Sequence, residues 1–107
     1  MMMRVNDFIR ILVALRDGGE VVWQSDLDDP DGGVCSASHR SGLQRAVRLD
    51  DILRCVSAGL IVPNHGFDNG LRFRHEYRLT PAGINAAKHL KVPLARALAT
   101  KPRITNS

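Results

Sequence analysis

The sequence predicts an α+β domain that is mainly α-helical, with a three-helix core, a two- to three-stranded antiparallel hairpin and a further C-terminal helix. Apolar residues recur at helical spacing in residues 5–16 and again in 43–58, and they alternate with charged residues in 71–79. Directly after that alternating segment, Thr80-Pro81 has the residue types that start a helix. A chain of 107 residues with these elements forms one domain.

The first predicted helix covers residues 5–16. Its buried stripe consists of apolar residues spaced one turn apart: Val5, Phe8, Ile9, Leu12 and Leu15. Asn6 or Asp7 lies near its start, and Gly18-Gly19 ends it. Three more apolar residues widen the stripe: Ile11, Val13 and Ala14. The wide stripe indicates either a second contact surface, such as a dimer interface, or a helix sunk deeply in the core.

The next segment contains a cluster of acidic residues. Residues 20–23 predict a short strand, residues 24–27 the start of a short second helix, and residues 28–33 an irregular loop. The aspartates suggest a calcium site, but Pro30 and Ala37 stand where an EF-hand in this register needs its ligands. We therefore predict no metal and no other cofactor.

Helical periodicity returns over residues 36–58, and a glycine ends it. The pattern fits one long helix or two helices joined by a bend. We favour a short helix or turn at 36–42 and a longer helix at 43–58. Four polar residues of the longer helix lie outside its apolar stripe: Gln44, Arg45, Arg48 and Arg54.

A hairpin and a last helix follow. Residues 60–63 predict a strand, and 64–70 a turn whose glycines and asparagines tolerate positive φ. The return strand puts Leu71, Phe73, Tyr77 and Leu79 on one face and Arg72, Arg74, Glu76 and Arg78 on the other. We expect a helix at 81–91. The predicted domain covers residues 1–92, and 93–107 hold a short helical turn and a basic, disordered tail.

The composition favours a binding protein. The formal net charge is +4, the sequence pI is about 9.7, and 12 of the 15 cations are arginines, which bind phosphates and base edges in a bidentate manner. No apolar run is long enough to span a bilayer, so we expect a cytoplasmic protein. Cys35 and Cys55 lack a secretory context and are expected to be free thiols rather than a disulfide.

Two motifs resemble winged helix-turn-helix regulators of the MarR, PadR and HxlR type. Residues 57–62, Ser-Ala-Gly-Leu-Ile-Val, are similar to the end of their recognition helix, and residues 77–83, Tyr-Arg-Leu-Thr-Pro-Ala-Gly, to the segment that closes their wing. The resemblance implies a divergent member of that superfamily. It also implies a dimeric transcriptional regulator, most simply a repressor, associated with the nucleoid when bound to DNA.

The resemblance further implies how double-stranded DNA is bound. The longer helix enters the major groove, and the arginine-bearing hairpin lies on the backbone or in the minor groove. The implied contacts are His39, Arg40, Ser41, Gln44, Arg45, Arg48, His65, Arg72, Arg74 and Arg78. The implied homodimer forms through residues 5–16 and 81–99.

The same residues have alternative roles. The arginines of the return strand can protect an exposed sheet edge, and those of the longer helix can pair with Asp50 or Asp51. The four histidines are scattered, and no grouping of nucleophile and base supports catalysis. A protein-interaction module without DNA binding is therefore the second hypothesis. A small enzyme or ligand sensor is the third hypothesis and ranks behind the other two, because it needs a pocket with convergent polar groups that the sequence does not indicate.

Overall fold

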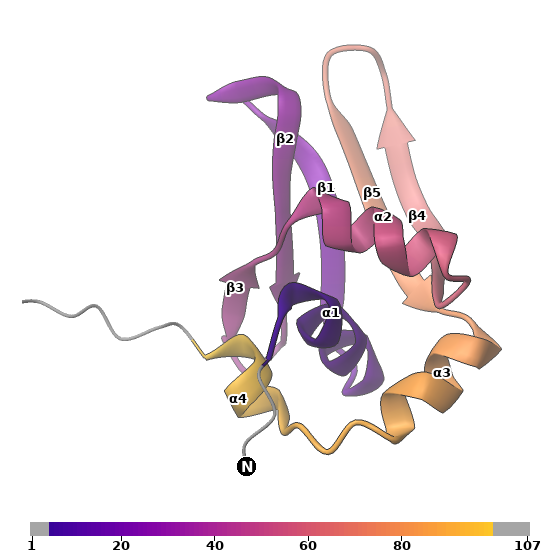
Figure 1. Cartoon of the computed structure of the whole chain (residues 1–107). Coiled ribbons are helices and arrows are strands. Elements are labelled where there is room, and N and C mark those ends of the chain that lie inside the picture. The colour runs from indigo at the N-terminus through magenta and orange to yellow at the C-terminus, as the bar shows by residue number, and fades with distance from the viewer. Residues whose placement is uncertain (1–4, 100–107) are drawn as a thin grey trace, which may run out of the picture.

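The computed structural model describes residues 5–99, without the side chains of residues 29–31; the predicted basic tail lies outside this range. The fold is α+β, with about as much strand as helix, and is built on one five-stranded antiparallel sheet. The prediction of a mainly helical winged helix-turn-helix is therefore wrong. In chain order the elements are α1 (Asp7–Arg16), β1 (Glu20–Asp26), β2 (Asp29–Ser38), β3 (Gln44–Ala46), α2 (Leu49–Ser57), β4 (Ile61–Asp68), β5 (Phe73–Leu79), α3 (Pro81–Lys88) and α4 (Leu94–Leu98) (Figure 1). None of these helices is long and apolar enough to cross a membrane.

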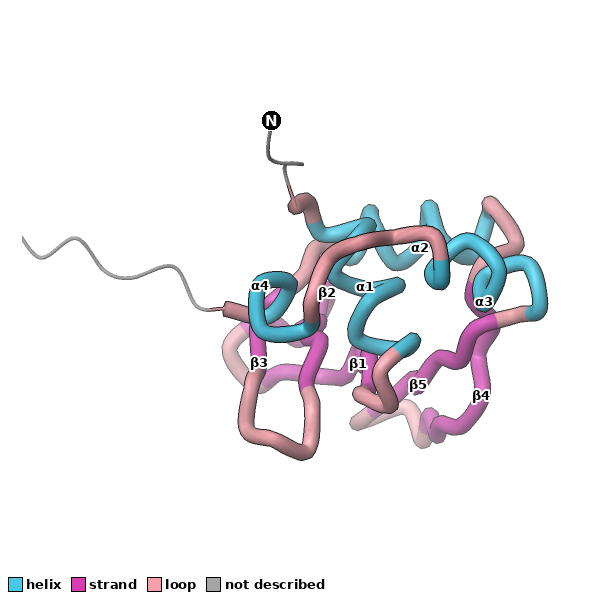
Figure 2. Tube along the Cα trace, turned by 90° about the horizontal axis from the view of Figure 1, so that it is seen from below, coloured by secondary structure: helices cyan, strands magenta, loops and turns pink. Residues whose placement is uncertain are grey.

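The sheet has the strand order β3-β2-β1-β5-β4, and every neighbouring pair is antiparallel. The described helices all lie on one face of the sheet (Figure 2). β1 is the central strand and pairs with β2 on one side and with β5 on the other. As a consequence, the β1–β2 and β4–β5 hairpins extend in the same direction, and their tips lie at the same end of the molecule (Figure 1).

The helix predicted for residues 43–58 begins only at Leu49. The chain before it forms β2 and β3, where the sequence predicts a loop, a helical turn and the first part of that helix. Cys35 and Ala37 of β2 are buried at alternate positions, as in a strand. Gly42 has a φ of 98°, which lies in the left-handed region, so a right-handed helix does not continue through it.

The start of α2 is held by α1. Arg48 has extended backbone angles, and its backbone N–H donates to Oδ2 of Asp7 at 3.0 Å. Asp7 also forms an ion pair of 2.5 Å with Arg10. Asp50 and Asp51 lie in the first turn of α2, where the positive end of the helix dipole favours carboxylates.

β1 extends to Asp26, so the short helix predicted at residues 24–27 is wrong. Gln24 pairs with Val34 of β2 and with Arg74 of β5. A segment with strand partners on both sides satisfies its backbone groups in the sheet, and this pairing outweighs a weak local preference for helix.

The predicted antiparallel hairpin over residues 60–79 is confirmed, and β4 continues further than the sequence predicts, to Asp68. The predicted helix start is also confirmed, since Thr80 Oγ1 accepts a hydrogen bond of 3.0 Å from the backbone N–H of Gly83. Gly83 is buried, and a Cβ atom there would collide with the carbonyl oxygen of Leu60. The chain therefore needs glycine at this contact between α3 and the start of the hairpin.

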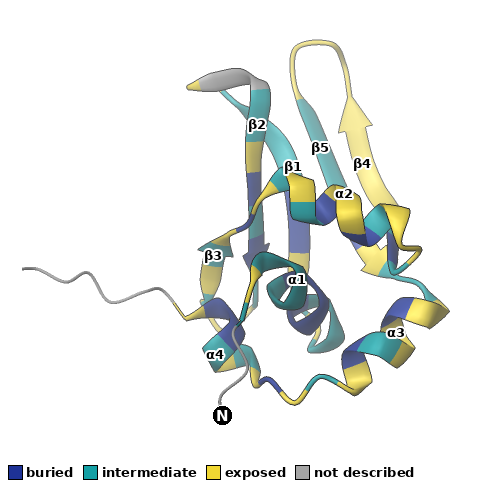
Figure 3. Cartoon of the chain, viewed as in Figure 1, coloured by how far each residue is buried: buried dark blue, intermediate teal, exposed yellow. Residues whose placement is uncertain are grey.

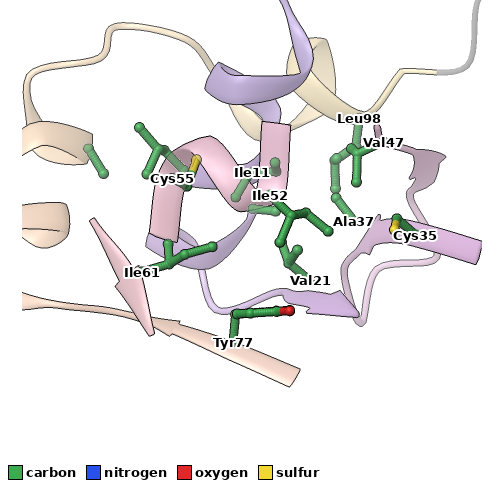
Figure 4. Close-up of a cluster of buried hydrophobic side chains, with 13 residues drawn as sticks. Ile11, Val21, Cys35, Ala37, Val47, Ile52, Cys55, Ile61, Tyr77 and Leu98 are labelled. Atoms are coloured by element: carbon green, nitrogen blue, oxygen red, sulfur yellow. The ribbon is translucent and has the colours of Figure 1, made fainter. Parts of the chain in front are cut away.

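The core lies between α1 and the sheet. Four consecutive residues of α1 are buried, Ile11 to Ala14, and Figure 3 shows α1 as partly buried and partly intermediate. Side chains from the sheet and from the other helices pack around them, among them Val21, Ile52, Ile61, Tyr77 and Leu98 (Figure 4). The three residues that widen the apolar stripe, Ile11, Val13 and Ala14, are therefore buried within their own chain, and they do not support the predicted dimer interface through residues 5–16.

Arg16 fixes the connection between α3 and α4. Its two terminal nitrogens donate to the carbonyl oxygens of Leu90 and Val92, each at 2.8 Å. Its Nε donates to Asp17 at 2.9 Å. This hydrogen bond lowers the pKa of Asp17 and raises the pKa of Arg16. The connection held in this way places α4 against α1, where Leu98 is buried.

Candidate interaction surface

The ten residues predicted to bind DNA lie at distant parts of the sheet. Gln44 and Arg45 belong to β3 at one edge, whereas His65 belongs to β4 at the opposite edge. Residues 39–41, His-Arg-Ser, form the turn between β2 and β3. Because the predicted recognition helix does not form, no helix carries both Gln44 and Arg48 into a groove.

Two of the predicted base-reading residues are engaged within the chain. The guanidinium of Arg45 donates to the carbonyl oxygen of Ala99 at 2.7 Å and so ties β3 to the residue after α4. The guanidinium of Arg48 lies 3.5 Å from the carboxylate of Asp50, and both side chains are largely exposed. The alternative structural role, pairing with a nearby aspartate, therefore applies to Arg48.

The turn that carries His39, Arg40 and Ser41 is organised around the histidine ring. The backbone N–H of Ser41 donates to Nδ1 of His39 at 3.0 Å, and the serine Oγ lies 2.8 Å from the same atom. Nδ1 is therefore the acceptor, and Nε2 donates to the carbonyl oxygen of Asp17 at 3.1 Å. These contacts join the turn to the end of α1, while Arg40 is exposed.

Arg74 is held by a polar network on the face of the sheet that the helices leave open. Its Nε donates to Glu76 at 3.0 Å, and one terminal nitrogen donates to the side chain of Gln24 at 2.8 Å. The other terminal nitrogen lies 3.5 Å from Glu20. Two carboxylates thus neutralise the arginine that the sequence predicts to contact a phosphate.

The charge of the described residues is nearly balanced. All 11 acidic residues lie within the described range, whereas the cations Arg4, Lys101 and Arg103 lie outside it, so 12 cations remain. Arg72 and Arg78 are exposed, and neither forms an ion pair with another described residue. The described fold therefore has only a small excess of positive charge with which to attract a polyanion.

The tips of the two hairpins enclose a cleft, which we call the hairpin notch. β1 and β5 pair as far as Gln24 and Arg74, and beyond this pair the hairpins separate. Ser25 closes the base of the opening, because its Oγ accepts a hydrogen bond of 3.2 Å from the backbone N–H of Phe73. The notch has a volume of about 610 Å³. It is lined by residues 24–27 of one hairpin and by residues 67, 68 and 70–74 of the other.

Large apolar side chains are exposed at both tips of the notch. Leu27 is 90% exposed at the tip of the β1–β2 hairpin, and Leu71 is 91% exposed at the tip of the β4–β5 hairpin. Phe67 lines the notch from β4 and is 52% exposed. Exposed apolar groups that gather in one place on a protein surface mark sites of interaction, whereas single scattered ones do not.

An aromatic cluster supports the base of the notch. The ring centroid of Trp23 lies 5.1 Å from that of Phe73 and 5.3 Å from that of His75. The indole N–H of Trp23 donates to the carbonyl oxygen of Gly32 at 2.8 Å, so the cluster also holds β2. These contacts fix the strands from which both tips project.

The histidine, cysteine and acidic side chains of the described residues are dispersed, and both cysteines are buried. No three of their histidine, cysteine or acidic side chains gather as a metal site. Cys35 and Cys55 are free and buried. Burial raises the pKa of the Cys35 thiol to about 11, and burial together with the nearby Asp51 carboxylate raises that of Cys55 to about 12, so neither is an activated nucleophile.

The sequence contains a weak signal for the notch. Leu27 stands between aspartates, and Leu71 follows a glycine, so both lie among residues typical of turns. Alternation alone places Leu71 on the core face of the return strand, and this prediction is wrong, because β5 begins only at Phe73.

Comparison of the chain with protein families, curated proteins and solved structures finds no match. The resemblance to winged helix-turn-helix regulators therefore stays a prediction.

Proposed function

We propose that the protein is a non-catalytic protein-binding module whose contact surface is the hairpin notch. The observation that carries the proposal is the exposure of Leu27 and Leu71, about nine-tenths each, at neighbouring tips of one sheet. Aromatic and polar contacts at the base of the notch support both tips. A surface held in place before binding loses little conformational freedom on binding.

The energy available at these tips is sufficient for recognition. Complete burial of one leucine side chain contributes about 1.5–3 kcal/mol, so the two leucines together supply several kcal/mol before Phe67 is counted. Asp26 and Arg72 lie next to the leucines and add polar groups of both signs. An apolar centre with a charged rim is the usual composition of a protein interface.

Selection of peptides from a random library against the immobilised full chain tests the proposal. We expect the selected peptides to compete with one another for the notch and to lose binding to the double variant Leu27→Asp, Leu71→Asp. Ile84→Asp is the matched control, because Ile84 is also an exposed aliphatic residue, 56% exposed, but lies on α3. Peptides that bind the tip variant as well as the original chain would refute the proposal.

Duplex DNA binding is a second candidate function, and the exposed arginines of β5 and its turn favour it. Arg72 and Arg78 are free of ion pairs within the described residues, and the whole chain carries a net charge of +4. This candidate keeps the DNA-binding regulator suggested by the sequence motifs, with β5 rather than a recognition helix as the contact.

A titration of random duplex DNA at low salt, followed by fluorescence anisotropy, tests the second candidate. It predicts affinity that falls steeply with salt and is lost in the double variant Arg72→Ala, Arg78→Ala. The double variant Lys88→Ala, Lys91→Ala removes the same charge elsewhere and is expected to bind almost normally. No affinity at low salt would exclude this function.

A further inference from the structure

We propose that the partner that fits the hairpin notch is a second copy of this chain, bound tip to tip around a two-fold axis. This inference rests on the proposed function, since it assigns a partner to the same surface. It places the contact between copies at the hairpin tips and not on α1, whose residues Ile11 to Ala14 are buried within their own chain.

The two walls of the notch differ in charge. The β1 side carries Asp26, and Asp28 lies two residues further along the same tip. The β5 side carries Arg72 and Arg74. Asp68 lies on this second wall as well, where its carboxylate accepts a hydrogen bond of 3.0 Å from the backbone N–H of the turn. One wall thus carries two carboxylates, and Arg72 is the arginine of the other wall that forms no ion pair among the described residues.

These opposite charges do not neutralise each other within one copy. The ion pairs among the described residues join Arg74 to Glu20 and Glu76, and none of them crosses the notch from the first hairpin tip to Arg72. Asp28 and Arg72 therefore remain available to groups from another molecule.

A two-fold interface places the same patch on both partners, so that patch must complement itself. The hairpin notch meets this condition in two respects. Rotation brings the acidic tip of one copy against the arginine-bearing wall of the other, and the symmetry repeats this contact once more. Each wall also ends in one exposed leucine, so the same rotation lets Leu27 of one copy pack beside Leu71 of the other.

The patch is small, and this limits the affinity. Because only the two hairpin tips take part, we expect each partner to bury less than the roughly 800 Å² of a standard stable interface and the dissociation constant to be on the order of 10–100 μM. The copies therefore separate and associate within an accessible concentration range.

Sedimentation velocity of the full chain over that range tests the inference. We expect the mean mass to rise from the 11.8 kDa of one chain toward twice that value. Leu71→Asp should weaken association at least tenfold, whereas Ile84→Asp should leave it unchanged. Circular dichroism is used to check that each variant is folded, which we expect because both substitutions replace exposed side chains.

Charge reversal provides the sharper test. Asp28→Arg gives a chain with arginine at both position 28 and position 72, and Arg72→Asp gives a chain with aspartate at both positions, so the two symmetric 28–72 contacts join like charges and each variant alone is expected to stay monomeric. An equimolar mixture is expected to form a heterodimer, because both of its symmetric contacts again join opposite charges. A mixture that stays monomeric, or single variants that still dimerise, would overturn tip-to-tip pairing.

The two proposals fail in different ways. A chain that remains a monomer up to about 1 mM, well above the expected dissociation constant, overturns self-association. If peptides are nevertheless selected at the notch and lost with the tip leucines, the notch is a site for another protein, and the proposed function stands without this inference.

Discussion

Replacement of Leu98 by alanine is expected to lower the free energy of unfolding by about 2–3.5 kcal/mol. Leu98 is fully buried and packs in the main core cluster through α4. The three carbons removed account for about 2.4 kcal/mol at about 0.8 kcal/mol each, and the cavity left behind adds to this loss. α4 has five residues and lies near the end of the described chain, so it can move to fill part of the cavity. We therefore expect a loss in the lower part of the usual range for such substitutions.

Urea denaturation followed by circular dichroism measures this loss, with the slope of the transition as a check that both proteins unfold in the same way. Ile84→Ala is the control, because it removes a similar number of side-chain carbons from a half-exposed position on α3. The free energy of unfolding of this variant should fall by less than about 1 kcal/mol. A loss below about 0.5 kcal/mol for Leu98→Ala would show that α4 is not docked on the core, and the account of the core would be wrong.

Three further predictions concern the ends of α1 and the buried thiols. Asp7→Ala should lower the free energy of unfolding by about 1–3 kcal/mol, because the backbone N–H of Arg48 at the start of α2 loses its carboxylate acceptor. Asp7→Asn keeps a side-chain oxygen and should recover part of this free energy in the same urea assay. The pKa of Asp17 is lowered chiefly by its hydrogen bond with Arg16, so its stabilising contribution is present above its ordinary pKa of 3.8 and is lost as the pH falls through the lower value in the folded protein. Asp17→Asn should therefore lose stability at neutral pH but flatten the decline at acid pH, and a deficit that is the same at every pH would contradict this. Cys35 and Cys55, with pKa values raised to about 11 and about 12, should react with a disulfide reagent only when the protein unfolds, and rapid labelling of the native chain would contradict their burial.

Local patterns were sufficient for the elements whose structure depends on nearby residues. The alternation in residues 73–79 and the cap at Thr80 are read correctly, because strand faces and helix starts depend on side chains a few positions apart. The first helix is also recovered, since its apolar period is strong. The partners that cover this helix are α4 and the sheet, and the spacing of apolar residues within the helix gives no information about them.

The prediction failed where long-range pairing decides the structure. Residues 35–38, Cys-Ser-Ala-Ser, are small and fit either a helical or a strand period, and it is their pairing with β1 and β3 that makes them a strand. With β3 formed, Arg45 is placed beside the end of α4 instead of on a recognition helix. The candidate DNA contacts depended on that helix, so they separate when it is absent.

Nuclear magnetic resonance of the full chain at increasing protein concentration tests whether the hairpin notch is the contact surface between copies. We expect the backbone amide signals of residues 25–28 and 67–74 to shift together as the concentration rises, while those of α3 and α4 stay in place. Shifts centred on α1 or α3, or no shifts when the mass is that of a dimer, would contradict the hairpin notch as the contact surface.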